Sequence, residues 1–270
     1  MNTSPRSSEF HLSSIHTLSV VIAALMTLLS LAGLFFQPLL YPTQELQRAF
    51  VANDMVNLFI GLPVLLVSLS LYRRGKLIGS LFLPGALLYV TYNYLAYLIA
   101  TWLAVQSLFY AALVGLSAVG VFQILASVDK ESVRQRLHGA VPERFAGGVL
   151  MVFGLLFFFR GSGQVYSAFT ESTSFFSPEM SVVYADLITT PLWIIGGWLL
   201  WRRQALGYIS AGGLLCQASL LFIGLLVFFI VQPFLTGAPF PPVDFVVILV
   251  MGMFFFIPLG LFVRGVLSTD

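Results

Sequence analysis

The sequence predicts an all-helical integral membrane protein with eight transmembrane helices, and three observations carry this prediction. Of its 270 residues 59% are hydrophobic and only 9% are charged, whereas a soluble domain has about 25% charged residues. The apolar residues form runs long enough for a helix to cross a bilayer, which takes about 20 residues. These runs do not alternate in the way that the ~10-residue strands of a membrane barrel do.

The eight apolar runs predict one transmembrane helix each, near 15–36, 55–72, 77–99, 103–127, 145–168, 181–201, 205–233 and 243–267. The first run follows a short polar leader, is longer than the hydrophobic region of a signal peptide and lacks an obvious A-x-A cleavage site. We therefore interpret it as a retained first helix.

The basic residues of the loops predict the orientation. Eleven of them fall on one side of the eight helices: Arg6, Arg73, Arg74, Lys76, Lys130, Arg134, Arg136, Arg144, Arg202, Arg203 and Arg264. The loops of the other side hold only Arg48. Since basic loops stay in the cytoplasm, we expect both termini there and a multi-pass protein of the inner (cytoplasmic) membrane.

An internal similarity predicts two parallel four-helix repeats, residues 1–128 and 145–270, joined by a charged cytoplasmic linker, residues 129–144. The stretch 71-LYRRGKLIGSLFLPGALL-88 is similar to 200-LWRRQALGYISAGGLL-215, and each follows a helix that opens with an acid, in 52-AND-54 and 185-AD-186. Four helices bring the chain back to the same side, so both halves have one orientation. The alternative is that any cytoplasmic hairpin needs an apolar end, two arginines and a turn.

The polar residues of the spans gather in the outer halves of the helices. Arg160 lies about 22 Å from the cytoplasmic end of the fifth helix, in the outer third of the hydrocarbon core. Polar side chains in lipid are costly and should face each other or water. We therefore predict a polar and aromatic cavity, open to the outside and lined by both halves, with these ligand-binding candidates: Arg160, Asp186, Asp54, Asn57, Tyr89, Asn93, Gln164 and Gln217.

Each candidate also has a structural interpretation. We expect Arg160 to pair with Asp186 or Asp54 across the cavity, but it is equally suited to tie two helices together or to extend toward the surface. The glycines of 161-GSG-163 favour close helix packing over an unwound, anion-binding nest. The tyrosines of residues 89–97 suit a pocket or an interfacial belt, and the two aspartates suit ion sites or first-turn helix caps.

Several chemistries lack support in the sequence. The single cysteine excludes an intramolecular disulfide and a C-x-x-C motif, and the three histidines form neither an H-E-x-x-H motif nor an intramembrane pair. No metal site and no cofactor are predicted, and neither a P-loop nor a G-x-S-x-G elbow is present. A net charge of +2 does not indicate nucleic acid. The expected partners are the lipid bilayer and a small-molecule or lipid ligand, while the sequence indicates no oligomeric state.

Residues 52–97, ANDMVNLFIGLPVLLVSLSLYRRGKLIGSLFLPGALLYVTYNYLAY, resemble a group of prokaryotic multi-spanning proteins described only as hypothetical membrane proteins. The shared features are the N-D start, the G-x-P, the R-R-G turn and the Y-N-Y run, and WRRQALGY is a weaker match in the second half. The resemblance implies an eight-helix membrane fold and brings no activity or site residue with it.

Three functions fit these features. The leading one is the transport or binding of a small molecule in the outer cavity. The second is a membrane-embedded enzyme acting on a lipid or prenyl substrate, with an aspartate as general acid or base. The third is a non-catalytic receptor or partner subunit.

Overall fold

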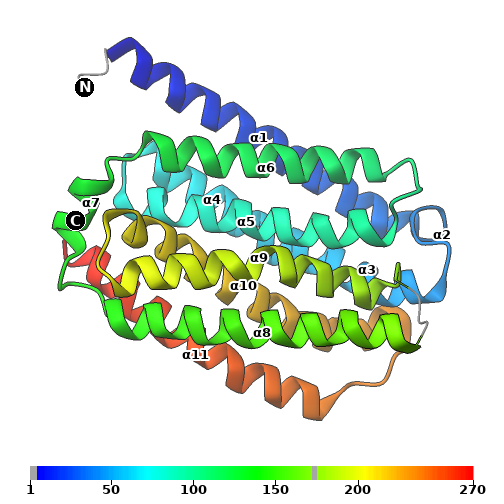
Figure 1. Ribbon diagram of the computed structural model, residues 1–270. Helices are drawn as coiled ribbons and strands as arrows, with labels where there is room; N and C mark the ends of the chain where they lie inside the picture. Colours follow the sequence, from blue (N-terminus) through cyan, green and yellow to red (C-terminus); the bar gives the residue numbers. More distant parts are fainter. Residues whose placement is uncertain (1–4, 172–174, 270) are drawn as a thin grey trace.

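The computed structural model describes residues 5–171 and 175–269, with side chains from residue 13, and all regular structure in these ranges is helical (Figure 1). The elements are α1 (Pro5–Phe35), α2 (Gln37–Leu40), α3 (Gln44–Val56), η1 (Asn57–Gly61), α4 (Leu62–Arg73), α5 (Leu77–Ala100), α6 (Ser107–Ser127), α7 (Lys130–Leu137), α8 (Glu143–Glu171), α9 (Pro178–Trp201), α10 (Ala205–Thr236) and α11 (Pro242–Leu267). The short π-helix η1 joins α3 to α4 without a break.

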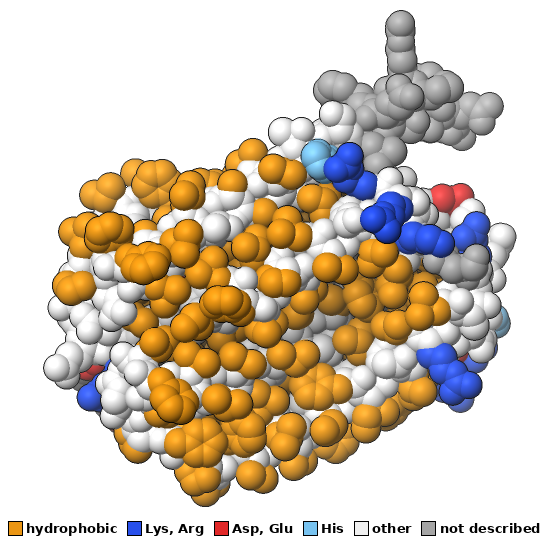
Figure 2. Space-filling view, turned by 180° about the vertical axis from the view of Figure 1, so that it is seen from behind, with side chains coloured by type: hydrophobic (Ala, Val, Ile, Leu, Met, Phe, Trp, Pro, Cys, Tyr) orange, Lys and Arg blue, Asp and Glu red, His pale blue; other side chains and the backbone are white. Residues whose placement is uncertain are grey.

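Within the described ranges, eight helical segments are long and apolar enough to cross a membrane, with α3, η1 and α4 forming the second of them. The prediction of a multi-pass membrane protein with eight such helices is thus confirmed by the structure. Leucine, valine and phenylalanine side chains are exposed along the flanks of the bundle (Figure 2). An apolar surface of this extent suits contact with lipid rather than water.

Three helices, the first, second and sixth, begin at least three residues before their predicted starts. The first begins at Pro5 instead of near 15. The second begins at Gln44, where Thr43 caps it by accepting a 3.3 Å hydrogen bond from the Leu46 amide. The sixth begins at Pro178 instead of near 181. Asp54 and Asp186 therefore lie in the third turn of their helices, and the interpretation of either as a first-turn cap is wrong. Hydropathy finds only the part of a helix that is apolar, and 44-QELQR-48 is a polar first turn.

The helices pack in two groups of four. In the first group α1 contacts α4 and α6, and α5 contacts the same two helices; in the second, α8 contacts α9 and α11, and α10 contacts the same two. Between the groups α5 lies against α10, where Gly85 of α5 meets the backbone of Gly213 so closely that a methyl group would overlap it. Small residues allow this close approach of two helix backbones.

The segment between the groups contains the helix α7, which the sequence predicts only as a charged linker. Its apolar side chains Val133 and Leu137 are buried and belong to the core that includes Tyr208 of α10. Buried Glu143 accepts hydrogen bonds from the hydroxyl of Tyr208 (3.1 Å) and from the amide of Gly139 (2.8 Å). The linker is therefore fixed against the start of α10.

The start of α1, the end of α11 and the helix α7 lie at one end of the bundle, on the left of Figure 1. Lysine and arginine side chains gather at this same end, on the right of Figure 2. The opposite end carries α2 and the starts of α3, α9 and α11, and we call it the distal end. The basic loops, which the sequence predicts on one side of the membrane, thus lie at the same end of the bundle.

The two Arg-Arg turns have the same backbone structure at an interval of 128 residues, one less than the 129 that separates Arg73-Arg74 from Arg202-Arg203 in the sequence. Gly75 (φ 69°) corresponds to Arg203 (φ 56°), both in the left-handed region. Four backbone N–H to C=O hydrogen bonds recur at this interval: 74 to 70 and 202 to 198, 75 to 72 and 203 to 200, 76 to 71 and 204 to 199, and 79 to 76 and 207 to 204.

Candidate ligand cavity

A cavity of about 860 Å³ lies between the two helix groups, with walls from α3, α5, α8, α9, α10 and α11. Its lining includes Glu45, Glu179 and Asp244, which stand in the first turns of α3, α9 and α11. The cavity therefore opens at the distal end. It extends as far as Trp193, which lies 14 residues beyond Glu179, or about 21 Å at 1.5 Å per residue.

The deep part of the cavity is aromatic. Phe157, Trp193 and Phe222 line it, and the rings of Phe157 and Trp193 stand edge to face at 6.1 Å. Beneath them Phe255 packs against Trp193 at 5.2 Å and against Phe222 at 5.1 Å. The indole N–H of Trp193 donates to Oε1 of Gln217 (3.2 Å). The cavity thus ends on a packed floor rather than continuing through the bundle.

Asp186 is the acid nearest the middle of the cavity wall. Its Oδ1 accepts a 2.8 Å hydrogen bond from the hydroxyl of Tyr92 on α5. Among the described residues no donor is bonded to Oδ2, and Asp186 lines the cavity, so this oxygen is free to bind a ligand. The hydroxyl of Thr190, one turn further along α9, donates a hydrogen bond to the backbone carbonyl of Asp186 (2.8 Å).

Arg160 on α8 lines the same cavity and is exposed. In the described part of the chain the only ion pair within 4.0 Å joins Arg134 to Glu131, so Arg160 forms no direct ion pair with Asp186 or Asp54. α8 continues as a helix through residues 161–163, which contradicts the anion-binding nest. A methyl group on Gly161 would come within 3.1 Å of Leu187, as expected for close α8–α9 packing.

Asp54 lies in a separate buried cluster in the first helix group. Only 1% of its surface is exposed. Oδ2 accepts a 2.7 Å hydrogen bond from the hydroxyl of Tyr41, and Oδ1 accepts one of 3.1 Å from Tyr97. Burial, followed by the charge of Asp54, raises the pKa of Tyr41 well above its ordinary value, so Tyr41 remains a hydroxyl donor at neutral pH.

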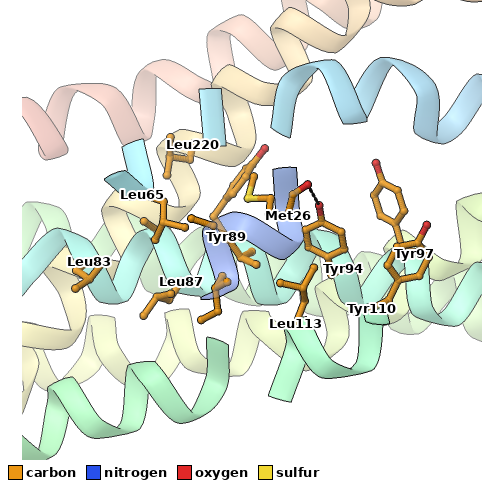
Figure 3. Close-up of a cluster of buried hydrophobic side chains, with 14 of the residues drawn as sticks. Met26, Leu65, Leu83, Leu87, Tyr89, Tyr94, Tyr97, Tyr110, Leu113 and Leu220 are labelled. Carbon is orange, nitrogen blue, oxygen red and sulfur yellow. Dashed lines mark hydrogen bonds between the residues drawn. The ribbon is translucent and has the colours of Figure 1, made fainter. Parts of the chain in front are cut away.

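Asparagine side chains connect this cluster to the cavity wall. Nδ2 of Asn53 donates to the hydroxyl oxygen of Tyr97 (3.2 Å) and to Oδ1 of Asn93 (3.1 Å), and both asparagines line the cavity. Tyr89, also in the wall, donates to Oδ1 of the buried Asn57 (3.2 Å). Figure 3 shows Tyr97 beside Tyr94 and Tyr110 within the core of this group.

Of the eight candidate residues, four line the cavity: Arg160, Asp186, Tyr89 and Asn93. The expectation that the other four lie in its wall is corrected by the structure. Asp54 and Asn57 are buried behind the wall, Gln217 is fully buried beneath the floor, and Gln164 is absent from the lining. Helical spacing places residues on a face but does not say which neighbour that face meets.

Sequence reasoning missed other residues of the two sites. Tyr41 lies outside every predicted span, and Glu45, Asn53 and Glu179 precede the predicted starts of their helices. One sequence feature could have predicted the start of α3. Threonine is a favoured N-cap residue, and Thr43 stands directly before the polar residues Gln44 and Glu45 and the apolar Leu46.

The described residues contain no group of three or more histidine, cysteine, aspartate or glutamate side chains able to hold a metal ion. A scan against models of known protein families, a search of curated proteins and a search of solved structures each find no match to this chain.

Proposed function

We propose that this protein binds a small molecule in the distal cavity and transports it across the membrane. The observation that supports this most directly is the cavity itself, about 860 Å³ between two helix groups, which is within the usual range of 300–1,000 Å³ for ligand sites. Its position between two packed groups suits a site that opens when one group moves against the other.

The cavity favours a small amphipathic ligand. Phe157, Trp193 and Phe222 offer a large aromatic surface in its deep part, and such rings bury apolar groups well. Arg160 suits an anionic group, and the free oxygen of Asp186 suits a hydrogen-bond donor or cation. We infer a ligand that carries a polar or zwitterionic end and an apolar body.

The distribution of charge supports an orientation in which the distal end faces outward. Since the basic side chains gather at the opposite end (Figure 2), where α1 begins and α11 ends (Figure 1), the positive-inside rule assigns that end to the cytoplasm. Both termini are then cytoplasmic, and the protein belongs to the inner (cytoplasmic) membrane, with its cavity open to the outside.

We also propose that residues 1–128 and 145–270 are parallel repeats. The 128-residue interval of the two turns supports this, as does Pro63, whose counterpart at the same interval is Pro191. At this interval Asp186 corresponds to Leu58, so the acids of 52-AND-54 and 185-AD-186 are not equivalent. Their different surroundings agree with this register.

Ligand binding is tested by a thermal-shift screen of small amphipathic compounds on the purified protein, with native mass spectrometry of any species that copurifies. A ligand present at 100 times its Kd stabilises the folded state by about 2.7 kcal/mol. We expect at least one compound to stabilise the wild type and to lose this effect in Arg160→Met and Asp186→Asn. Arg144→Met, at the opposite end of the bundle, is the matched control.

Two results would contradict this proposal. In the first, no compound gives a stabilisation that depends on Arg160 or Asp186. In the second, the copurifying species is a lipid or prenyl compound that the protein converts, which would establish the membrane-enzyme alternative. For a bound solute, uptake into proteoliposomes then distinguishes transport from binding alone.

A further inference from the structure

We propose that Asp54 takes up and releases a proton, and that Tyr97 transmits its protonation state to the wall of the cavity. This deepens the proposed function by naming the proton as the coupling ion, and it rests on that function for the role of the cavity. The step is a proton exchange only: a proton from water joins a carboxylate oxygen of Asp54 and later leaves it.

Asp54 is a buried acid without a cationic partner. Its side chain is 1% exposed, and in the described part of the chain no lysine, arginine or histidine nitrogen lies within 4.0 Å of it. On its own helix the charged residues Glu45 and Arg48 are exposed and precede it by nine and six residues. A buried carboxylate is costly unless it is paired, hydrogen-bonded or neutralised by a proton.

The titratable groups that face Asp54 from the neighbouring elements are all tyrosines. Tyr41 comes from the segment before α3, Tyr94 and Tyr97 from α5, and Tyr110 from α6. Their rings form one cluster, with Tyr97 at 6.4 Å from Tyr41, 5.4 Å from Tyr94 and 5.3 Å from Tyr110. Figure 3 shows the rings of Tyr94, Tyr97 and Tyr110. α1 contributes Ser30, whose hydroxyl lies 3.2 Å from that of Tyr94.

The hydroxyl of Tyr97 has one proton and two acceptors within reach. Oδ1 of Asp54 lies at 3.1 Å and the backbone carbonyl of Phe50 at 3.2 Å. While Asp54 is ionised, Tyr97 donates to its carboxylate, since a charged acceptor forms the stronger bond. Once Asp54 is protonated, its carboxyl donates to a hydroxyl oxygen and the Tyr97 proton turns to Phe50.

This change reaches the cavity because the groups around Tyr97 are wall residues. Phe50, Asn53 and Asn93 all line the cavity, and the amide of Asn53 is shared between the Tyr97 oxygen and Asn93. A turned Tyr97 hydroxyl therefore alters the hydrogen bonds of two wall residues. Protonation of Asp54 and the shape of this wall are linked, as coupling between two sites requires.

Two further polar atoms, one in this cluster and one a turn beyond Asp54, have no partner among the described residues. The hydroxyl of Tyr110 and Nδ2 of Asn57 are buried and unbonded, although buried polar groups nearly always form hydrogen bonds. The side chains that hold them are 1% and 0% exposed. Tyr110 packs directly on Tyr97, so the cluster has spare hydrogen-bonding capacity next to the group that we expect to turn.

The first experiment detects the proton on Asp54 by infrared difference spectroscopy of the full-length protein during a pH titration. We expect a carboxyl C=O band that appears on acidification, shifts in D2O, and is lost in Asp54→Asn. The band remains in Asp186→Asn and in Tyr97→Phe, which keep the carboxyl group of Asp54. A titration with sodium chloride replaced by choline chloride should give the same band, and a dependence on sodium would overturn the proposal.

The second experiment measures coupling through the labelling rate of a cysteine at Val182, an exposed residue of the cavity wall. The native Cys216 is buried, and the protein without Val182→Cys gives its background. Because only the thiolate reacts, the rate at each pH is first corrected for the ionised fraction of the thiol. We expect the corrected labelling rate to change with pH by about fivefold or more, the lower end of usual allosteric coupling. Adding Asp54→Asn or Tyr97→Phe should remove this dependence, whereas the control Tyr166→Phe should retain it.

Any of three results overturns this inference: no carboxyl band that depends on Asp54, a band that depends on sodium, or a corrected labelling rate that does not follow pH. None of these results affects the ligand screen, whose readouts depend on Arg160 and Asp186. Conversely, a ligand screen that finds no ligand does not change the expected infrared titration of Asp54. The two proposals therefore fail separately.

Discussion

The hydroxyl of Tyr92 donates a 2.8 Å hydrogen bond to Oδ1 of Asp186 and so joins α5 of the first helix group to α9 of the second. Both residues line the cavity. The bond leaves Oδ2 of Asp186 without a donor among the described residues. This contact thus joins the two groups beside the cavity and holds one carboxylate oxygen of Asp186.

Replacing Tyr92 by phenylalanine should destabilise the protein, because Asp186 loses its hydroxyl donor. A hydrogen bond to a charged group contributes about 1.5–3 kcal/mol, and we expect a loss in this range in the unfolding free energy measured in detergent. Tyr166→Phe is the control, since Tyr166 is 71% exposed. Equal stability of the two variants would mean that the Tyr92 bond is not formed in solution.

Replacing Gly33 by alanine should disrupt the Asp54 cluster. A methyl group there would overlap Oδ2 of Asp54 and lie 2.7 Å from the hydroxyl of Tyr41, so the carboxylate must move away from its donor. We expect a clear drop in the thermal midpoint. Gly115→Ala is the matched control on α6, where a methyl group meets nothing within 4 Å and alanine favours the helix. A similar drop in both variants would contradict the packing around Asp54.

The two Arg-Arg turns predict opposite effects at corresponding positions. Arg203 has a φ of 56°, and a left-handed conformation costs a non-glycine residue about 1–2 kcal/mol. Arg203→Gly should therefore stabilise the protein by about 1 kcal/mol, and Gly75→Ala should destabilise it by about the same amount. Both are measured by unfolding in detergent. Stabilisation of the protein by Gly75→Ala would be inconsistent with the positive φ of 69° there.

The start of α7 should depend on pH through Asp129. Its side chain caps the helix by accepting from the Ser132 hydroxyl (2.7 Å) and from the amides of Ser132 and Glu131. The bond from the Ser132 side chain, followed by the one from its amide, lowers the pKa of Asp129 below its ordinary value. A lowered folded-state pKa stabilises the protein above the unfolded pKa of about 3.9. This contribution is lost as pH falls through the lower folded value.

Hydrogen exchange measures this effect directly. We expect the amide of Ser132 to exchange faster in Asp129→Ala than in the wild type at neutral pH. The difference should shrink as the pH falls below about 4, after correction for the intrinsic rate. In Asp129→Asn, which keeps an acceptor oxygen and does not titrate, protection should be independent of pH in this range. A pH-dependent protection in that variant would assign the effect to another group.

The sequence was sufficient for properties that depend on each segment alone. Transfer of a helix into lipid depends mainly on its own side chains, so the eight apolar segments were correctly predicted. The face of α5 that carries Tyr89, Asn93 and Tyr97 was also predictable, because helical periodicity places residues three or four apart on one side. The helix start at Gln44 was not, since its first turn is polar.

The tertiary structure decided which polar residues share a site. Asp54 and Asp186 look alike in sequence, yet α5 separates them: Tyr97 turns toward Asp54 and Tyr92 toward Asp186. Gln217 was predicted to line the cavity, but it lies beneath the cavity floor, where it accepts a hydrogen bond from Trp193. The physical reason is that a side chain's neighbours depend on how helices pack, and close contacts such as Gly85 on Gly213 fix that packing between segments 128 residues apart.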